Sequence, residues 1–339
     1  MRCPSLTELP PPPAGKTGWP WTEETPRAAD AMPDGRPWPR ITVVTPSYNQ
    51  AQFLEETIRS VLLQGYPDLE YLVMDGGSDD GSVKIIEKYS PWLAYWTSEP
   101  DRGQSDAINK GLRRATGELM AWLNSDDVYY AGSLRTVAFA TAEPGWDIYL
   151  GAMDKVEVHP DHTRLVKRSL PTEGLPIHPF PILANGRQHM FHFYQPAMFW
   201  TRRLWERTGG LDERYHFVMD LEWCNRALAC GAEVRITKDV LTRFAVHPQS
   251  KSEALHHRQM AEYVAMCWRL SRTREFRRIP CFLSALRPAQ RTLSLLSRRA
   301  EQRRQRARAV AYRTAARALK AARLYVPGLS GAERVEDHE

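Results

Sequence analysis

The sequence predicts an α/β fold: a mostly parallel, Rossmann-like sheet flanked by helices, with a basic helical extension at the C-terminal end. Short apolar, β-branched segments alternate with segments of helical periodicity between residues 41 and about 140. Polar residues directly follow three of these apolar segments, at the points where parallel strands would end. A chain of 339 residues, 42% of them hydrophobic, can build one large domain of this kind with an appendage.

The first strand is expected at Ile41–Thr45, a β-branched run that Pro46 interrupts. Apolar residues then recur at helical spacing and predict a helix through Leu54, Ile58, Val61 and Leu62. A second strand is expected at Glu70–Met74, and it ends in the turn-forming run Asp75–Gly81. The apolar spacing that follows predicts a second helix through Val83, Ile86 and Tyr89.

A third helix is expected at Ala107–Ala115 and a third strand at Leu119–Leu123. Beyond residue 145 the periodicity is weaker, although Asp220–Ala229 still has a helical pattern. Three further strands are expected, at Asp147–Leu150, Val234–Ile236 and Arg243–Val246. Strands that alternate with short helices favour a parallel sheet, in which ligands bind beyond the carboxyl ends of the strands.

Composition divides the chain into three regions. Residues 1–39 are rich in proline, which predicts an extended, irregular lead-in that Trp19, Trp21 and Trp38 attach to the domain surface. Residues 40–255 form the expected α/β domain, and residues 256–339 form the basic extension. The formal net charge of +6 is unevenly distributed, because residues 269–323 hold 17 basic and 2 acidic residues. That segment carries +15, and the rest of the chain therefore carries −9.

Several classes of protein are excluded by composition. The five cysteines include no pair at metal-binding spacing, which favours a reduced, cytosolic setting. No apolar run approaches the roughly 18–20 residues that a membrane-spanning helix needs. Prolines rather than an apolar segment follow the N-terminus, so no secretory signal is expected. We therefore expect a cytoplasmic protein.

Polar clusters at three successive strand ends predict a ligand site: Ser47 and Asn49, then Asp75, then Asn124, Asp126 and Asp127. Oxygen side chains after an apolar strand can hold a hard divalent cation and leave positions open for phosphate oxygens. Each cluster also has a purely structural interpretation, as a turn or as a helix cap supplied by Asp127. The three together favour a site that binds a nucleotide and a metal ion.

The stretch Ile41 to Val128 resembles the inverting family 2 glycosyltransferases, which have the GT-A fold. The resemblance is carried by ITVVTPSYNQ, YLVMDGGSDDGS, SEPDRGQSDAINKGLRRATGE and LMAWLNSDD, in this order. Downstream, YQPAMFWTRRLWERTGGLDERYHFVMDLEWCNRAL is similar to the acceptor-side region of that family, and RFAVHPQSKS is similar to its late metal-binding loop. The similarity covers about 215 of the 339 residues and neither terminus.

The resemblance implies transfer of a sugar from a nucleotide-diphosphate donor, with Mn²⁺ or Mg²⁺ as the metal. Residue by residue, it implies a nucleotide-sugar pocket formed by Thr45, Ser47, Asn49, Asp75, Arg102, Asp106, Asn124 and Ser125, with Asp75 reading the base, usually uracil. Asp126 and His247 are the implied metal ligands, although a histidine in a surface loop is the alternative for His247. Asn124 departs from the family pattern, which has an aspartate there, so the sequence supplies one charge fewer to the metal.

An inverting transfer also needs a carboxylate that accepts the proton of the acceptor hydroxyl. The resemblance places it at the start of the helix near Met219–Trp223, where Asp220 matches the aspartate of the family and Glu222 is the rival. Helical residues two apart point to different faces, so the two carboxylates cannot both accept the same proton. A helix-capping role is the alternative for Asp220.

The expected reaction has two rivals. A nucleotidyltransferase would also use an α/β sheet with metal-binding carboxylates, but Thr45–Asn49 lacks a glycine-rich, lysine-bearing loop. The basic extension suggests a nucleic-acid-binding protein, which would not account for the acidic body or the strand-end clusters. We expect a saccharide or lipid-linked saccharide acceptor and no nucleic acid partner. Two interpretations stay open for a set of basic residues at helical spacing: peripheral docking on an anionic membrane surface, or a solvated helix packed on the domain or on a second subunit. These residues are Arg299, Arg303, Arg306, Arg313, Arg317 and Lys320.

Overall fold

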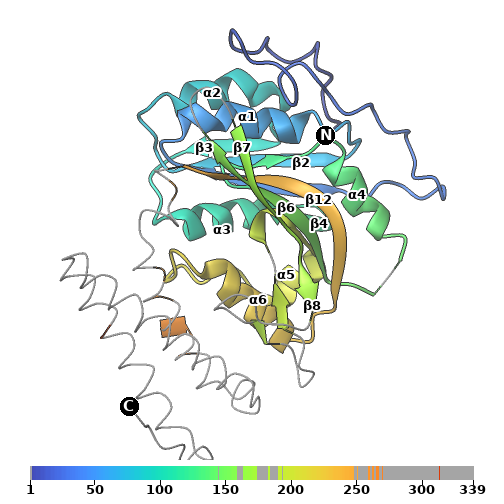
Figure 1. Cartoon of the computed structure of the whole chain (residues 1–339), viewed down its shortest axis with the longest axis vertical. Coiled ribbons are helices and arrows are strands. Elements are labelled where there is room, and N and C mark those ends of the chain that lie inside the picture. The colour runs from blue at the N-terminus through green and yellow to red at the C-terminus, as the bar shows by residue number, and fades with distance from the viewer. Residues whose placement is uncertain are drawn as a thin grey trace, which may run out of the picture.

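A computed structural model describes residues 2–143, 145–158, 163–173, 182–183, 190–192, 194–247 and 250, together with residues 259, 262, 265, 266, 269 and 313. Within this part of the chain, a nine-stranded sheet has the order β3-β2-β1-β4-β11-β6-β12-β5, with β7 paired to β6. Helices lie on both faces of this sheet, α1 and α2 on one side and α3 on the other (Figure 1). The expected α/β architecture is confirmed.

The first half of the sheet is parallel and contains the strands predicted at Ile41–Thr45, Glu70–Met74 and Leu119–Leu123. Its strands are β1 (Ile41–Ser47), β2 (Leu69–Asp75), β3 (Tyr95–Ser98) and β4 (Leu119–Trp122). The connecting helices are α1 (Ala51–Leu62), α2 (Ser82–Tyr89), continued by the 3₁₀ turn η1 (Ser90–Trp92), and α3 (Gln104–Arg114). Because β1 and β2 pair in register, Ser47 lies opposite Asp75. Two of the polar strand ends therefore meet.

The second half of the sheet differs from the prediction. Its strands are β5 (Val128–Tyr129), β6 (Ile148–Val158), β7 (Thr163–Ser169), β11 (Met198–Thr201) and β12 (Val234–Val246). The two short strands expected at 234–236 and 243–246 are one continuous strand. Its pairing with β6 shifts register after Ile236 and after Val240, and these irregularities accommodate the polar residues between the two expected strands. The antiparallel strand β11, between β4 and β6, was not predicted.

The remaining elements lie between and beside these strands. They are α4 (Ser133–Ala140), η2 (Gln195–Ala197), α5 (Arg202–Thr208), α6 (Met219–Ala229) and a small sheet of β8 (Thr172–Glu173), β10 (Met190–His192) and β9 (Ile182–Leu183). The helix expected at Asp220–Ala229 is α6. None of the helices in the described part of the chain is long and apolar enough to cross a membrane.

The N-terminal segment 2–40 contains turns but neither helix nor strand, and it is fastened to the domain by Arg59 of α1. The side chain of Arg59 is completely buried. It donates hydrogen bonds to the backbone oxygens of Pro20 (3.0 Å), Pro10 (2.8 Å) and Trp21 (2.9 Å), and to the hydroxyl of Tyr89 (3.0 Å). The irregular lead-in is thus held through its carbonyl groups, which this guanidinium binds from inside the domain.

Replacing Arg59 by lysine is expected to destabilise the fold. An ammonium group cannot reproduce the planar fork that reaches several acceptors at once, so carbonyl groups of the lead-in lose their donors. Hydrogen bonds to charged groups contribute about 1.5–3 kcal/mol, and we expect a loss of that size in the free energy of unfolding, measured in urea. Arg36→Lys is the control, because Arg36 lies in the lead-in itself and 46% of its side chain is exposed. Equal stability of both variants would contradict the role of Arg59.

Candidate functional site

The carboxyl ends of β1, β2 and β3 meet at one edge of the sheet, and Asp75 lies at the centre of this edge. Its carboxylate is 2% exposed and accepts four hydrogen bonds. Their donors are the backbone N–H groups of Gly77 (3.1 Å) and Ser78 (2.8 Å) and the hydroxyls of Ser78 (2.6 Å) and Ser98 (2.7 Å). Gly77 has φ of 84°, a conformation that favours glycine. Asp75 therefore shapes the turn that follows β2.

The turn after β1 is joined to the turn after β2 through Asn49. This residue has φ of 53°, in the left-handed region that asparagine tolerates. Its N–H donates to Ser78 Oγ (2.8 Å), and its Oδ1 accepts from the N–H of Asp79 (3.0 Å). The side chain of Asn49 thus holds the two turns together, in addition to any contact with a ligand.

The two other residues expected from β1 lie deeper in the protein. The hydroxyl of Thr45 is fully buried and hydrogen-bonds to the hydroxyl of Tyr71 at 3.0 Å, so this side chain packs inside the sheet. Ser47 Oγ is also buried and has no hydrogen-bond partner within the described part of the chain. Their placement in a nucleotide pocket stays a prediction, and of the two only Ser47 presents an unsatisfied polar atom.

Tyr48, which the sequence reasoning did not select, is the exposed group at this edge. Its side chain is 62% exposed. A Cβ atom on Gly76 would lie 2.7 Å from Oδ2 of Asp101 and 3.2 Å from Cδ2 of Tyr48, so the turn comes close to both side chains only because residue 76 is glycine. The sequence pattern that could have identified Tyr48 is an aromatic residue inside a polar turn at the end of a strand.

Arg102 and Asp106, expected near the sugar or the diphosphate, form an ion pair at the start of α3. The backbone N–H and the guanidinium of Arg102 donate to the Asp106 carboxylate at 3.0 and 3.1 Å, and the guanidinium also contacts Glu213 at 2.6 Å. Burial alone would raise the pKa of Asp106, but the hydrogen bonds from Arg102 and the charge of Lys110 hold it below its usual value. The side chain of Arg102 remains 74% exposed, so it can still contact a ligand.

A chain of side-chain amides fixes Asn124, which follows β4. Its Oδ1 accepts from Gln104 Nε2 (2.7 Å), and its Nδ2 donates to Asp127 Oδ2 (3.1 Å) and Gln195 Oε1 (3.3 Å). Gln195 in turn donates to the backbone oxygen of Trp122 (2.8 Å). Both ends of the Asn124 amide are therefore bound by protein groups, which positions the loop 124–127. No local pattern connects Gln195 to this loop in the sequence.

Asp126 and His247 come together at the end of this loop, although they are 121 residues apart. Oδ2 of Asp126 lies 3.1 Å from Nε2 of His247. The neighbouring Asp127 explains the contact, because its Oδ1 accepts from the N–H of Ala245 (3.1 Å) and holds the end of β12 against the loop. Phe53 of α1 stacks on the His247 ring at a centroid distance of 4.3 Å.

The chemistry of this pair fits a divalent metal ion. A carboxylate oxygen and an imidazole nitrogen are donors that Mn²⁺ accepts, and Asp126 is 22% exposed and therefore accessible to solvent. Nδ1 of His247 is buried and has no partner among the described residues. Those residues include no group of three or more His, Cys, Asp and Glu side chains that could hold a metal. The protein thus offers two donors here, and the other positions would fall to ligand oxygens and water.

Asp127, by contrast, is a structural carboxyl group. It is completely buried, and this burial, together with the charge of Asp126, raises its pKa well above the usual value. Both of its oxygens accept hydrogen bonds from protein groups, from Ala245 and Asn124. Asp127 therefore orients the loop that presents Asp126.

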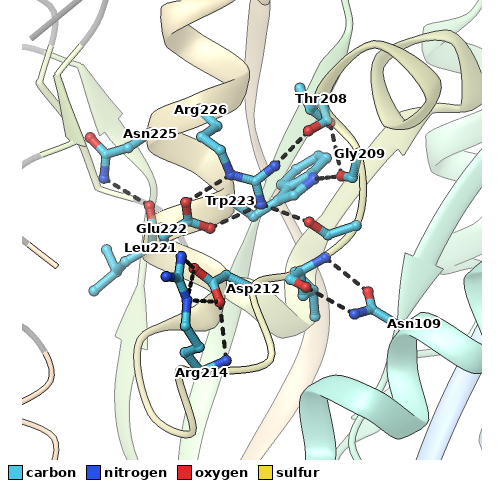
Figure 2. A network of polar contacts seen from close by, with 12 residues as sticks. Asn109, Thr208, Gly209, Asp212, Arg214, Leu221, Glu222, Trp223, Asn225 and Arg226 are labelled. Carbon is cyan, nitrogen blue, oxygen red and sulfur yellow. Dashed lines mark hydrogen bonds and ion pairs between the residues drawn. The ribbon is translucent and has the colours of Figure 1, made fainter. Parts of the chain in front are cut away.

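α6 carries the two carboxylates that the sequence left as rivals, and their environments differ; Figure 2 shows Glu222 and its contacts. Glu222 is buried, and the guanidinium of Arg226 donates to both of its oxygens, at 2.7 and 2.9 Å. Arg226 also donates to the backbone oxygens of Thr208 (2.5 Å) and Gly210 (2.7 Å). Glu222 is therefore part of a network that fastens α6 to the end of α5. Asp220, in the first turn, is half-buried, and its Oδ1 accepts from the N–H of Leu221 (2.8 Å).

The loop that leads into α6 is attached to α3, the helix that also carries Arg102's partner Asp106. Asn109 donates to the backbone oxygen of Leu211 (2.9 Å) and accepts from its N–H (2.8 Å), as Figure 2 shows. Ser105 Oγ donates to the backbone oxygen of Tyr215 (2.8 Å). One helix thus links the strand-end clusters to the segment that bears Asp220.

Comparisons with known proteins agree with this geometry. Residues 42–209 match Glycosyl transferase family 2. An uncharacterized glycosyltransferase of Mycobacterium tuberculosis is 32% identical over 197 residues, which cover 57% of this chain and 70% of the relative. An uncharacterized glycosyltransferase of Rickettsia typhi is 26% identical over 234 residues, 67% of this chain and 70% of the relative.

Two solved structures share the fold. The mannosyltransferase PcManGT of Pyrobaculum calidifontis, in complex with GDP-Man and Mn²⁺, has a TM-score of 0.53 and 20% identity, and the match covers 86% of this chain and 91% of that one. Residues 1–349 of TarS from S. aureus, in complex with UDP-GlcNAc, have a TM-score of 0.51 and 18% identity, with 83% and 92% covered. The fold of this chain is the GT-A fold of glycosyltransferases. The chain belongs to glycosyltransferase family 2, as the sequence motifs predicted.

Proposed function

We propose that this enzyme transfers a sugar from a nucleotide-diphosphate donor, a UDP-sugar, to a hydroxyl group of a saccharide or lipid-linked saccharide, with inversion at the anomeric carbon. The observation that carries this proposal is the Asp126–His247 pair, 3.1 Å apart, beside the strand ends that hold Asp75 and Asn49. The site thus combines two metal donors with turns suited to a nucleotide. The mannosyltransferase of similar fold was solved with GDP-Man and Mn²⁺, which supports the same type of donor.

The nucleoside part of the donor fits the edge formed by β1, β2 and β3. Exposed Tyr48 offers an aromatic face for the base, and the close turn at Gly76 lets a ligand approach the backbone. Asp75, Asn49 and Ser47 complete this edge with polar groups. Arg102, which is largely exposed at the start of α3, supplies a positive charge for the sugar or the diphosphate.

Asp126 and His247 would hold Mn²⁺ or Mg²⁺, which when bound neutralises charge on the diphosphate leaving group. Asn124 and Asp127 set the position of Asp126, because they fix the loop through Gln104, Gln195 and Ala245. Ser125, in the same loop, is 5% exposed, and its backbone oxygen accepts from the hydroxyl of Thr57 (2.9 Å). The loop is therefore rigid before a donor binds.

Asp220 is the proposed general base. The acceptor oxygen forms a bond to the anomeric carbon while the bond from that carbon to the diphosphate oxygen breaks. The acceptor proton passes to Asp220, and the nucleoside diphosphate leaves with the electron pair. The pairing of Glu222 with Arg226 supports Asp220, because Glu222 would have to break two short hydrogen bonds to reach an acceptor.

The proposal is tested by a panel of nucleotide sugars. We expect one donor, in the presence of Mn²⁺, to raise the melting temperature of the full chain more than the others, because ligands that bind the native state stabilise it. Transfer of that sugar to a hydroxyl acceptor, followed by NMR, should give a product whose anomeric configuration is opposite to that of the donor. A product that retains the configuration would overturn the inverting displacement, and stabilisation by no nucleotide sugar would overturn the donor assignment.

Tyr48→Ala is expected to weaken nucleotide binding. Stacking of a base on an aromatic side chain contributes about 1–3 kcal/mol, so the Kd for UDP should rise by about 5- to 150-fold in titration calorimetry. Phe139→Ala is the matched control, because this aromatic residue is also exposed (43%) but lies on α4. An unchanged Kd in the Tyr48 variant would remove this residue from the base site.

The basic C-terminal helix belongs to the same proposal as a docking element for an anionic membrane surface, where lipid-linked acceptors would be found. Of the basic residues that predict it, the structure describes only Arg313, so this expectation lies outside the described residues. The test is sedimentation with anionic vesicles at low and high salt, because peripheral electrostatic binding is lost when salt screens it.

A further inference from the structure

Two residues beyond the expected end of the catalytic domain contact the loop that leads into α6, and a third enters the hydrophobic core. They are Glu262, Arg269 and Met266; each is helical, and their spacing of four and three residues is that of one face of a helix. The Glu262 carboxylate accepts from the N–H of His216 (2.9 and 3.0 Å) and from the N–H of Phe217 (2.7 Å). Met266 is 2% exposed and belongs to the hydrophobic core. This face is therefore packed against the domain, and the expected boundary at residue 255 stays a prediction.

Arg269 adds a third contact to the same loop. Its guanidinium lies over the ring of Tyr215, 5.7 Å from the centroid, which is within the range of a cation–π interaction. Tyr215, His216 and Phe217 are consecutive, and α6 begins two residues later, at Met219. The contacts from Glu262 and Arg269 thus converge on the segment immediately before the first turn of α6.

α6 has two acidic residues in its own first turn, Asp220 and Glu222. Its N-cap residue, Val218, makes no side-chain capping hydrogen bond. A carboxylate near a helix N-terminus interacts favourably with the helix dipole, and backbone N–H groups removed from water need acceptors. Glu262 meets both requirements from a distant part of the chain. It holds the two residues that precede the N-cap of α6, next to the first turn that carries Asp220.

The opposite side of the loop is held by the donor-side helix α3. Ser105 donates to the backbone oxygen of Tyr215, and Arg102 pairs with Glu213 at 2.6 Å. A Cβ on Gly103 would lie 3.2 Å from Nδ1 of His216, so the loop also packs closely against the start of α3. The loop is thus fixed between the donor side and Glu262.

We infer that Glu262 is a positioning residue for the acceptor side of the site: it fixes the loop 215–218 and through it the direction of Asp220. This role rests on the proposed transfer reaction, in which Asp220 accepts the proton. The beginning of the C-terminal region is then part of the catalytic apparatus. The carboxylate of Glu262 contacts the backbone of the loop. Its removal is therefore expected to lower the rate of transfer and to leave the affinity for the donor nucleotide intact.

The experiment compares Glu262→Ala and Glu262→Gln with the wild type, all as the full chain. Glu206→Gln is the control, since Glu206 is 67% exposed and pairs with Arg202 on α5. A displacement of about 1 Å in a reacting group can cost up to about 10²-fold, so we expect kcat to fall about tenfold in Glu262→Ala. Glu262→Gln keeps one oxygen acceptor and should give an intermediate kcat. The Kd for UDP should change less than about twofold in both variants.

Hydrogen exchange gives a readout that does not depend on activity. The amides of His216 and Phe217 should exchange faster in both Glu262 variants, whereas the amides of α3 should exchange as in the wild type. Wild-type kcat and wild-type exchange would overturn the inference, and so would a parallel loss of UDP affinity, which would indicate a general structural role. If Glu262→Ala does not fold, Glu262→Gln provides the same comparison. A wild type that transfers no sugar would refute the proposed function, while the exchange rates would still decide whether Glu262 fixes this loop.

Discussion

Asp126→Asn is expected to reduce sugar transfer by about 10²–10³-fold, the equivalent of the several kcal/mol that a bound metal ion contributes to a developing negative charge. Asparagine keeps the size of the side chain and an oxygen within reach of His247, but it removes the charge that would attract a divalent cation. Asp126 is the accessible carboxylate of the loop, since Asp127 is completely buried and both of its oxygens accept hydrogen bonds. The change should therefore act on metal and donor binding while the loop retains its fold.

Titration calorimetry with UDP separates a loss of metal binding from a loss of donor binding. In the wild type, Mn²⁺ should lower the Kd for UDP, and in Asp126→Asn this dependence on Mn²⁺ should be lost. His247→Ala should have a smaller effect and raise the Mn²⁺ concentration needed for half-maximal activity. Since the ring of His247 packs on Phe53, the melting temperature of this variant must be measured as well. Full activity of the wild type in excess EDTA would refute the metal requirement altogether.

The site could be predicted from the sequence as far as it depends on the parallel half of the sheet. Alternating strands and helices bring successive strand ends to one edge, so Ser47, Asp75 and the loop after β4 had to lie near one another. The register of β1 with β2 confirms this for Ser47 and Asp75. The helical spacing of apolar residues was equally informative, because it located α1, α2 and α3.

The groups that hold these side chains in place could not be predicted, because they come from distant segments. Gln195 reaches Asn124 across 71 residues, and Glu262 reaches the loop before α6 from beyond the predicted domain. The lead-in is bound through its carbonyl oxygens, which every residue has and no sequence pattern marks. The strand β11 was missed because its short run, Met198–Thr201, is buried almost throughout and shows no alternation.

Residue types alone also did not distinguish an exposed side chain from one that faces the core. Thr45 lies in the matching motif, yet its hydroxyl bonds to Tyr71 in the interior. Tyr48, three residues further along, is the exposed one. Its direction follows from the turn at Asn49, whose left-handed backbone reverses the chain after β1. Such directions depend on the tertiary structure of the turn.

Asp220→Asn is expected to lower kcat by roughly 10²–10⁴-fold, the range that general base catalysis contributes, with little change in the Kd for UDP. Asparagine preserves the shape of the side chain and can still accept from the N–H of Leu221, but it cannot take up the acceptor's proton. In the proposed reaction Asp220, on α6, serves the acceptor, whereas the groups proposed to bind the nucleotide belong to the strand ends and α3. A loss of rate without a loss of donor affinity is therefore the signature of this residue.

Glu222→Gln is the matched variant, because it changes a carboxylate to an amide two residues away on the same helix. The guanidinium of Arg226 would then keep one acceptor instead of two, and the contacts of Arg226 with Thr208 and Gly210 would remain. We expect Glu222→Gln to lower the melting temperature more than Asp220→Asn does and to leave most of kcat intact. The opposite pattern, with Glu222→Gln inactive and Asp220→Asn nearly normal, would assign the base to Glu222. In that case the pairing with Arg226 would have to open before an acceptor could bind, and kcat would then depend on the strength of that pair.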